Sequence, residues 1–216
     1  MIIAVSGVDC SGKSTQIERL VARLESQGRD AQVRWYRPGY SDELNALRAL
    51  LRRRSGVLPP PGAGTAREKA FSRPWVSRAW IAVAVLDTVW TYGIKLRCAS
   101  WLGRLIICDR YMWDAVLDLH LRFPERVALS GALATLLRVS CPTPRVNVLL
   151  HLSSEEALDR QEKKAEPFPD DRETFLKRHG VYDAWVQDGR FDVIDAERSI
   201  EDVHAQIVSL VPGIAP

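Results

Sequence analysis

Residues 7–15, with the sequence Gly-Val-Asp-Cys-Ser-Gly-Lys-Ser-Thr, closely follow a run of apolar residues that starts at Ile2. They match the phosphate-binding pattern G-x-x-x-x-G-K-[ST] at every position. Glycines at both ends of the pattern let the backbone wrap so that its N–H groups point at phosphate oxygens, at the positive end of the next helix. The chain is therefore expected to begin with a strand, a phosphate-binding loop and a helix.

The side chains of the loop complete a site for a nucleoside triphosphate. Lys13 can reach the β- and γ-phosphates, and the Ser14 hydroxyl is placed to bind Mg²⁺, which bridges the same oxygens. A nucleoside triphosphate and Mg²⁺ are thus the expected ligands. The candidate nucleotide-binding residues in this loop are Gly7, Cys10, Ser11, Gly12, Lys13, Ser14 and Thr15.

Strand-like runs alternate with helical or loop sequence along the chain. They lie at residues 2–5, 31–36, 104–108, 146–152 and 191–194. Between the first two, Ile17, Leu20, Val21 and Leu24 recur at the spacing of an amphipathic helix, and Gly28 supplies a stop. This alternation predicts an α/β P-loop fold, a five-stranded parallel sheet with helices on both faces. With 216 residues, one domain over residues 1–216 is expected.

The third of these runs ends in a carboxylate. Residues 105–108 are all apolar and are followed by Asp109, which is typical of a buried parallel strand that delivers an acid at its carboxyl end. In open α/β sheets ligands bind at that edge. Asp109 is therefore expected to lie beside the phosphate-binding loop, as a second candidate Mg²⁺ ligand with Ser14.

Two segments are expected to move. Residues 55–66 are rich in proline and glycine, which disfavour both helix and sheet, and we expect a mobile loop there. Residues 160–170 are charged and interrupted by prolines, and they follow the end of the fourth strand. We expect a short lid whose cations close over phosphates. A solvated helix end is the alternative for this segment.

Charge and cysteine content exclude several classes of protein. The net charge is only +3 and the basic residues are spread out, so no nucleic-acid partner is expected. The four cysteines, Cys10, Cys98, Cys108 and Cys141, have no metal-binding spacing and suit a reducing cytoplasm. The chain opens directly on a strand, without a charged leader and a cleavage site, so secretion is not expected.

The most hydrophobic segment covers residues 75–94 and contains Arg78 and Asp87. Its longest uncharged run, residues 79–86, is far shorter than the roughly 20 residues that span a bilayer. We therefore expect a buried core helix here and no membrane partner.

Several motifs, in this order along the chain, resemble those of the thymidylate kinase family. They are the loop with Asp9 inside it, the Asp109-Arg110-Tyr111 triplet, the cationic segment at Arg160 and the Val-Ile-Asp-Ala ending at residues 193–196 with the helix after it. The loop alone would identify only a nucleotide binder, whereas the combination is specific to this group and spans nearly the whole chain. The resemblance implies phosphoryl transfer from ATP to a small-molecule acceptor, with thymidine monophosphate (dTMP) as the best single choice.

The resemblance also implies roles on the donor side of the reaction. Lys13, Ser14 and Thr15 would hold the ATP phosphates and Mg²⁺. Arg160 would lie near the adenine or the transferring phosphoryl group, as part of the lid. The turn formed by Asp195 and Ala196 would line the adenine pocket.

On the acceptor side, the resemblance implies that Asp9 faces the sugar hydroxyl of the acceptor, and that Asp109 and Arg110 lie between donor and acceptor. Elementary chemistry supports such a set independently. Phosphoryl transfer is catalysed mainly by cations that neutralise charge on the moving group, and Lys13, Arg110 and Arg160 are the natural candidates.

The residues expected to read the acceptor depart from the family. Thr88 stands where an arginine usually binds the monophosphate, and losing that guanidinium weakens the case for a phosphate acceptor. Arg37 occupies the place of a glutamate, and it either replaces the missing cation or caps a loop. Trp90 falls near the pyrimidine position, where it either stacks on the acceptor or packs in the core.

After Tyr111 the chain has two acidic residues, Asp114 and Asp118, on one face of the next helix. Carboxylates repel a monophosphate but suit a hydroxyl-bearing acceptor, since they accept hydrogen bonds and can take a proton. A solvent-facing acidic pair, favourable in the first helical turns, is the alternative. The candidate acceptor-binding residues are thus Asp9, Arg37, Trp90, Arg110, Tyr111 and Asp114.

Three functions remain open from the sequence. The first is a nucleoside monophosphate kinase acting on dTMP, and the second is a related kinase that phosphorylates a hydroxyl of a nucleoside, sugar or other metabolite. The third is a non-catalytic nucleotide-binding module. The resemblance also implies a homodimer packed through the helix at residues 75–94, with Trp80, Val83 and Trp90 on one broad face.

Overall fold

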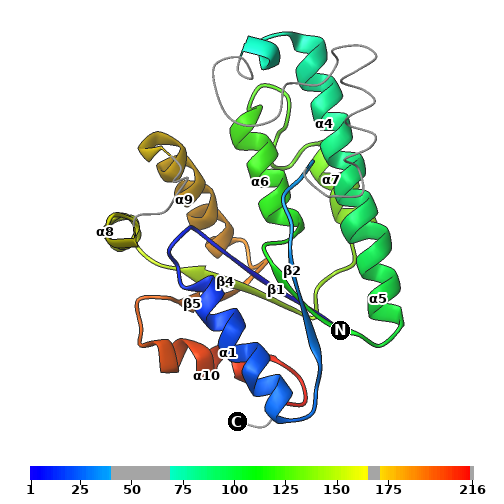
Figure 1. Cartoon of the computed structure of the whole chain (residues 1–216). Coiled ribbons are helices and arrows are strands. Elements are labelled where there is room, and N and C mark those ends of the chain that lie inside the picture. Colours follow the sequence, from blue (N-terminus) through cyan, green and yellow to red (C-terminus); the bar gives the residue numbers. More distant parts are fainter. Residues whose placement is uncertain (40–68, 165–170, 215–216) are drawn as a thin grey trace.

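The computed structural model describes residues 1–39, 69–164 and 171–214. They form a five-stranded, all-parallel sheet in the order β2-β3-β1-β4-β5, with helices on both faces (Figure 1). The strands are β1 (Ile2–Gly7), β2 (Ala31–Trp35), β3 (Leu105–Asp109), β4 (Val146–His151) and β5 (Asp192–Asp195). The predicted α/β fold and its five strands are confirmed. The expected mobile loop at residues 55–66 and residues 165–170 of the expected lid lie outside the described residues.

The helical elements follow the strands in the alternation expected from the sequence. They are α1 (Lys13–Ser26), α4 (Pro74–Thr88), the π-helix η1 (Val89–Leu96), α5 (Arg97–Trp101), α6 (Met112–Arg122), α7 (Ala132–Ser140), α8 (Ser154–Lys164), α9 (Arg172–Gln187) and α10 (Ile200–Leu210). The amphipathic prediction for α1 holds, because Ile17, Leu20 and Leu24 are buried.

The sheet separates two hydrophobic cores, because side chains alternate between its faces. In β1, Ile3 and Val5 face the core that is covered by α1, α9 and α10. Ile2 and Ala4 face the other core, which α4, α6 and α7 cover. Every residue of β1 is buried, as expected for the central strand of a parallel sheet.

The strand register brings the candidate residues to one edge of the sheet. Val5 pairs with Asp109, Gly7 pairs with Leu150, and His151 pairs with Asp195. The loops that follow β1, β3, β4 and β5 therefore meet at the carboxyl edge, where the order of strands reverses around β1.

Helices α4, η1 and α5 form one continuous helical segment. By length and composition, Pro74–Trp101 could cross a membrane, and it is the one such helix in the described parts of the chain; the core helix of a soluble protein passes the same test. The prediction that this segment is too short to span a bilayer was based on its uncharged run, residues 79–86, whereas the whole helix is long enough. Trp80 and Val83 are buried in the second core, so the prediction that they share an outward face with Trp90, which is 45% exposed, is wrong.

Candidate active site

The phosphate-binding loop has the backbone geometry that its glycines permit. Gly7 has φ 146°, and a Cβ there would lie 2.6 Å from the carbonyl oxygen of Leu150 in the adjacent strand. Gly12 caps helix α1 with φ 88°, in the left-handed region. Cys10 also has positive φ, 63°, although it is not glycine. Non-glycine residues with a strained backbone are concentrated at functional sites, where the surrounding structure holds them in place.

Lys13 lies inside this loop and is almost fully buried. Its ammonium group donates hydrogen bonds to the carbonyl oxygens of Gly7, at 3.1 Å, and Val8, at 2.6 Å. Burial, together with the charge of Arg110, lowers the pKa of Lys13 to about 8, although Asp9 and Asp109 oppose this shift. The Lys13 ammonium is poorly solvated in the free protein. Its interaction energy therefore becomes more favourable when negatively charged phosphate oxygens replace the neutral loop carbonyls.

Asp9 and Arg110 form an ion pair across the mouth of the loop. The Arg110 guanidinium also donates to the Gly7 carbonyl oxygen at 3.4 Å. Burial alone would raise the pKa of the Asp9 carboxyl, but the charges of Arg110 and Lys13 hold that pKa below its ordinary value. Asp9 is therefore a carboxylate at neutral pH, able to accept a hydrogen bond from a ligand hydroxyl.

The backbone at Arg110 is fixed on both sides. Its φ is 71°, an uncommon value for a residue other than glycine. The N–H of Arg110 donates to the Val5 carbonyl oxygen at 2.9 Å, and the Tyr92 hydroxyl donates to the Arg110 carbonyl oxygen at 3.1 Å. The bend after β3 therefore aims the guanidinium at the phosphate-binding loop.

Asp109 has an oxygen that fits a metal ion or its water shell. Its Oδ1 is buried and has no hydrogen-bond partner among the described residues. Burial raises the pKa of the Asp109 carboxyl, and the charges of Lys13 and Arg110 partly offset that effect. The exposed Ser14, which carries a hydroxyl group, lines the same cavity. Carboxylate and hydroxyl oxygens suit Mg²⁺, so these two residues fit the ion that nucleotide-binding loops use.

One cavity of about 280 Å³ joins these groups. It is lined by Asp9, Cys10, Gly12, Lys13, Ser14, Thr15, Trp35, Tyr36, Arg37, Asp109, Arg110, Asp118 and Arg178. The structure thus brings together the loop, Asp109, Arg110 and Arg37, as expected from the sequence. The loop residues Gly7 and Ser11 are not among the lining residues, and Ser11 is buried.

Arg178 is an additional cavity residue, beyond those predicted from the sequence. Its guanidinium donates to Asp118 at 2.7 Å, and both side chains line the cavity. A signal was available, because Arg178 lies on the buried face of α9 with Phe175 and Tyr182, three residues before it and four after it. A cation within an apolar helical stripe indicates a polar partner or ligand at that position.

Three predicted acceptor-binding residues do not line this cavity in the described parts of the chain. Trp90 is 45% exposed on η1. Tyr111 is buried, and its hydroxyl donates to the Pro142 carbonyl oxygen at 2.7 Å. Asp114 is 1% exposed and belongs to the core. The expectation that Asp114 faces an acceptor or solvent is therefore corrected.

The Asp114 carboxylate is the centre of a buried network. It accepts hydrogen bonds from the Ser6 hydroxyl at 2.6 Å, the Tyr182 hydroxyl at 2.5 Å and the Tyr111 backbone N–H at 2.8 Å. These contacts connect β1, α9 and the start of α6. Asp114 therefore holds the elements of the site together, and its oxygens are already occupied by internal donors.

Replacing Asp114 by alanine is expected to lower the free energy of unfolding by about 3 kcal/mol, because three buried donors lose their acceptor. Urea denaturation measures this change. Asp159→Ala, at an exposed position of α8, is the matched control and should unfold close to the wild type. Equal stability of the two variants would contradict the network.

The position of the missing family arginine is also buried. Thr88 is fully buried, and its hydroxyl donates to the Ala84 carbonyl oxygen at 2.8 Å and lies 3.2 Å from the Tyr36 hydroxyl. Tyr36 is followed by Arg37, whose side chain lines the cavity. Thr88 therefore supports the chain segment that carries Arg37 and contributes no charge of its own.

Arg160 and the Asp195–Ala196 turn lie together, outside the central cavity among the described residues. The Arg160 guanidinium donates to the Ala196 carbonyl oxygen at 3.1 Å and to Glu156 at 2.7 Å. The Ala196 N–H donates to the His151 carbonyl oxygen at 2.7 Å, which fixes the turn against β4. Helix α8 is thus tied to the turn that was expected to contact adenine.

The pKa of Lys13 gives a prediction for nucleotide binding. The ATP phosphates favour the charged lysine, so the complex binds more protons than the free protein above pH 8. ATP affinity is therefore expected to be constant below that pH and to fall above it, by up to about tenfold per pH unit. Calorimetric titrations at about pH 7, about pH 8 and about pH 9 measure the decline. In Lys13→Arg the side chain stays charged, and a decline of equal size there would contradict the assignment.

The amino-acid sequence is similar to those of known proteins. The model of the thymidylate kinase family matches residues 85–207, more than half of the chain. A thymidylate kinase of Bifidobacterium longum is 32% identical over 227 aligned residues, covering 100% of this chain and 98% of the relative. Thymidylate kinases of Chlorobium luteolum and Pseudomonas putida are 27% and 28% identical, and the alignments cover 96% and 99% of this chain and 95% and 97% of the relatives. The chain therefore belongs to the thymidylate kinase family of phosphotransferases.

Proposed function

We propose that the protein transfers the γ-phosphoryl group of ATP to dTMP. The observation that carries the proposal is the single cavity in which Lys13 and Ser14 of the phosphate-binding loop meet Arg37, Arg110 and Arg178. The loop suits the donor phosphates, and the arginines suit the phosphate of a nucleoside monophosphate. The relatives with full-length similarity are named thymidylate kinases.

On the donor side, the loop amides and Lys13 bind the phosphates of ATP. The Lys13 ammonium exchanges its contacts with the Gly7 and Val8 carbonyl oxygens for contacts with phosphate oxygens. Ser14 and Asp109 would hold Mg²⁺, which neutralises charge on the donor oxygens when bound. The orphaned buried oxygen of Asp109 supports this assignment.

On the acceptor side, Arg37 and Arg178 replace the cation that is lost at Thr88. The acceptor phosphate carries nearly two negative charges, which attract the guanidinium groups of Arg37, two residues after β2, and Arg178, on helix α9. Trp35 lines the same cavity and is 65% exposed, so its indole is available to stack on the base. The Asp9 carboxylate accepts the hydrogen bond of the acceptor sugar, and Arg110 lies between the two phosphate groups.

A hydroxyl acceptor has less support. The carboxylates that motivated it are both occupied, because Asp114 binds internal donors and Asp118 pairs with Arg178. Asp9 lines the cavity as an ionised carboxylate and pairs with Arg110. Its pKa is below the ordinary value, which makes it a weak general base.

Coupled assays of ATP consumption test the proposal with each nucleoside monophosphate and with thymidine. We expect dTMP to give the highest kcat/KM and the product to be the nucleoside diphosphate. Turnover of thymidine with phosphate on the sugar oxygen would support the hydroxyl kinase instead. Absence of turnover with every monophosphate would exclude the proposed function.

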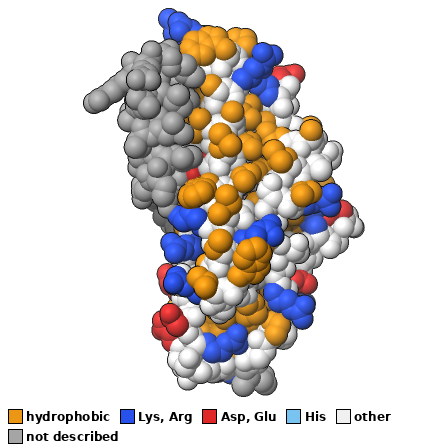
Figure 2. Space-filling view, turned by 90° about the vertical axis from the view of Figure 1, so that its right-hand side faces the viewer, with side chains coloured by type: hydrophobic (Ala, Val, Ile, Leu, Met, Phe, Trp, Pro, Cys, Tyr) orange, Lys and Arg blue, Asp and Glu red, His pale blue; other side chains and the backbone are white. Residues whose placement is uncertain are grey.

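We also propose a homodimer through the face formed by α4, η1, α5 and α7. Figure 2 shows apolar side chains in a nearly continuous band down one face of the molecule. Large apolar residues on these helices, or directly after α5, are exposed: Leu86, Trp90, Ile94, Trp101, Leu102, Leu136 and Val139. A band of this kind is typical of a protein interface. Light scattering at micromolar concentration should give the mass of a dimer, and Leu86→Glu should give a monomer.

We also propose that the enzyme is cytoplasmic and has no nucleic-acid or membrane partner. The four cysteines are present as thiols, and Cys108 and Cys141 are buried, which suits a reducing compartment. The proposed dimer uses the apolar helical segment for protein contacts.

A further inference from the structure

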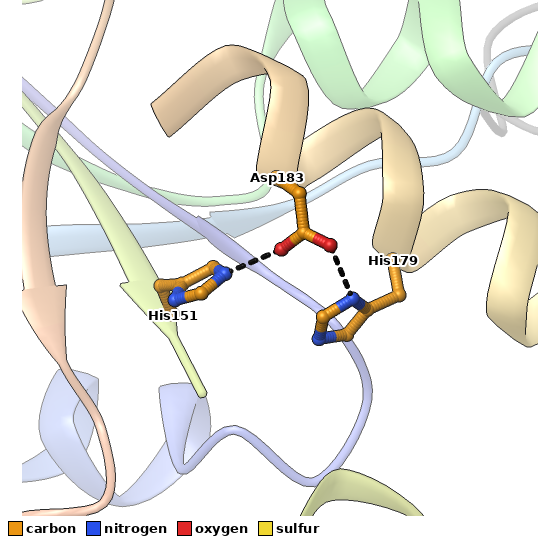
Figure 3. A group of neighbouring side chains, drawn as sticks. All are labelled: His151, His179 and Asp183. Atoms are coloured by element: carbon orange, nitrogen blue, oxygen red, sulfur yellow. Dashed lines mark hydrogen bonds and ion pairs between the residues drawn. The ribbon is translucent and has the colours of Figure 1, made fainter. Parts of the chain in front are cut away.

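Two histidines and an aspartate form a cluster at the carboxyl end of β4 (Figure 3). His151 is the last residue of β4, and His179 and Asp183 lie one turn apart on α9. The Asp183 carboxylate lies between the two imidazoles, 2.7 Å from Nε2 of His151 and 3.0 Å from Nδ1 of His179. One potential ligand atom from each residue lies within 4.8 Å of the other two.

The hydrogen bonds of His179 determine which of its nitrogens carries a proton. Its Nε2 lies 2.8 Å from the carbonyl oxygen of Leu152, which can only accept, so Nε2 is the donor. In a neutral imidazole Nδ1 then presents a lone pair. That lone pair faces the Asp183 carboxylate, which is also an acceptor. Two lone pairs in contact repel each other unless a cation lies with them.

The same arrangement is the usual one for a histidine that binds a metal. Such a residue coordinates through one nitrogen, while the other nitrogen donates to a backbone carbonyl or carboxylate that fixes the ring. The His179 side chain is 8% exposed and fixed in this way, whereas the side chains of His151 and Asp183 are 31% and 49% exposed and free to adjust. Solvent can therefore supply a further ligand.

We propose that His151, His179 and Asp183 bind a divalent transition-metal ion of the Zn²⁺ type. Two imidazoles and one carboxylate suit Zn²⁺ and its neighbours, whereas Mg²⁺ and Ca²⁺ prefer oxygen ligands. A tetrahedral ion with ligand distances of about 2.0–2.1 Å holds its ligands roughly 3.3 Å apart. The three ligand atoms lie within 4.8 Å of one another, and Asp183 is 2.7 and 3.0 Å from the two imidazole nitrogens, so small rotations of the side chains would bring them to that spacing. The site is separate from the Mg²⁺ site at Ser14 and Asp109.

The position of the cluster indicates what the ion would do. His151 ends the strand that precedes α8, and His179 follows Arg178 on α9. The backbone of His151 also holds the Ala196 turn, through its carbonyl oxygen. A bound ion would therefore join the base of α8 to the helix that presents Arg178 to the cavity.

The test uses the full chain, stripped of metal with a chelator and titrated with Zn²⁺ in the absence of nucleotide. Calorimetry should give one equivalent per chain, and Zn²⁺ should raise the melting temperature. His151→Asn and Asp183→Asn should each weaken Zn²⁺ binding by at least about tenfold. Both positions are partly exposed, so neither substitution opens a buried void. His204→Asn on α10 is the matched control and should bind as the wild type does.

Each outcome decides the proposal. The cysteines are common to all variants, so a loss of affinity confined to His151→Asn and Asp183→Asn assigns the ion to the cluster. Wild-type protein without saturable Zn²⁺ binding would overturn it, as would equal affinity in His151→Asn and His204→Asn.

Discussion

Lys13→Met is expected to reduce kcat for phosphoryl transfer by about 10³-fold, because the donor phosphates lose the one buried ammonium group of the loop. The same variant is expected to be more stable than the wild type at neutral pH. Burial lowers the pKa of Lys13 from 10.5 to about 8, which corresponds to a cost of roughly 3 kcal/mol for the charged side chain. The variant also loses the hydrogen bonds of Lys13 to two carbonyl oxygens, which reduces the expected gain in stability by about 1 kcal/mol.

The sign of the stability effect depends on pH in a defined way. The cost of the charged lysine is fully present below pH 8 and disappears as pH rises through the unfolded-state value of 10.5. Chemical denaturation should therefore show Lys13→Met as more stable by about 2 kcal/mol at neutral pH and as no more stable near pH 10.5. Lys177→Ala, an exposed lysine on α9, is the control and should keep wild-type kcat. Loss of both activity and stability in Lys13→Met would contradict the assignment.

The parts of the site that the sequence predicted well are those determined by local rules. The loop of residues 7–15 requires glycines at positions with positive φ, and the strand before it requires an uninterrupted apolar run. Asp109 follows because parallel strands share one carboxyl edge, which places the ends of β1 and β3 side by side. Motif spacing and hydrophobic periodicity are sufficient to predict the loop, the strand before it and the position of Asp109, since backbone geometry determines all three.

The failures concern side chains whose environment depends on distant elements. The spacing of Asp114 and Asp118 correctly places them on one face of α6, but only the packing of α9 shows that Asp114 meets Tyr182 and that Asp118 meets Arg178. Periodicity likewise could not distinguish the core-facing side of α4 from its exposed side, because both are apolar. A helix that is hydrophobic all round gives no directional signal.

Arg110→Ala is expected to reduce kcat by at least about 10³-fold, comparable to the loss of an arginine that stabilises the moving phosphoryl group. The substitution removes the partner of Asp9 and one of the cations that line the cavity. Arg110→Lys keeps a charge but cannot contact Asp9 and the Gly7 carbonyl oxygen with one planar group, so we expect only partial activity. Arg19→Ala, in an exposed ion pair, is the control and should retain wild-type kinetics.

The backbone at Arg110 allows activity to be separated from strain. With φ at 71°, any side chain with a Cβ is disfavoured there by about 1 kcal/mol relative to glycine. Arg110→Gly and Arg110→Ala should therefore lose activity equally, while the glycine variant should be the more stable by about 1 kcal/mol in urea denaturation. Such a result would mean that the protein keeps an arginine in an unfavourable backbone conformation because the guanidinium must point at the phosphate-binding loop. Equal stability of the alanine and glycine variants would contradict the strain. The backbone hydrogen bonds that position 110 makes with Val5 and Tyr92 would then hold an unstrained residue.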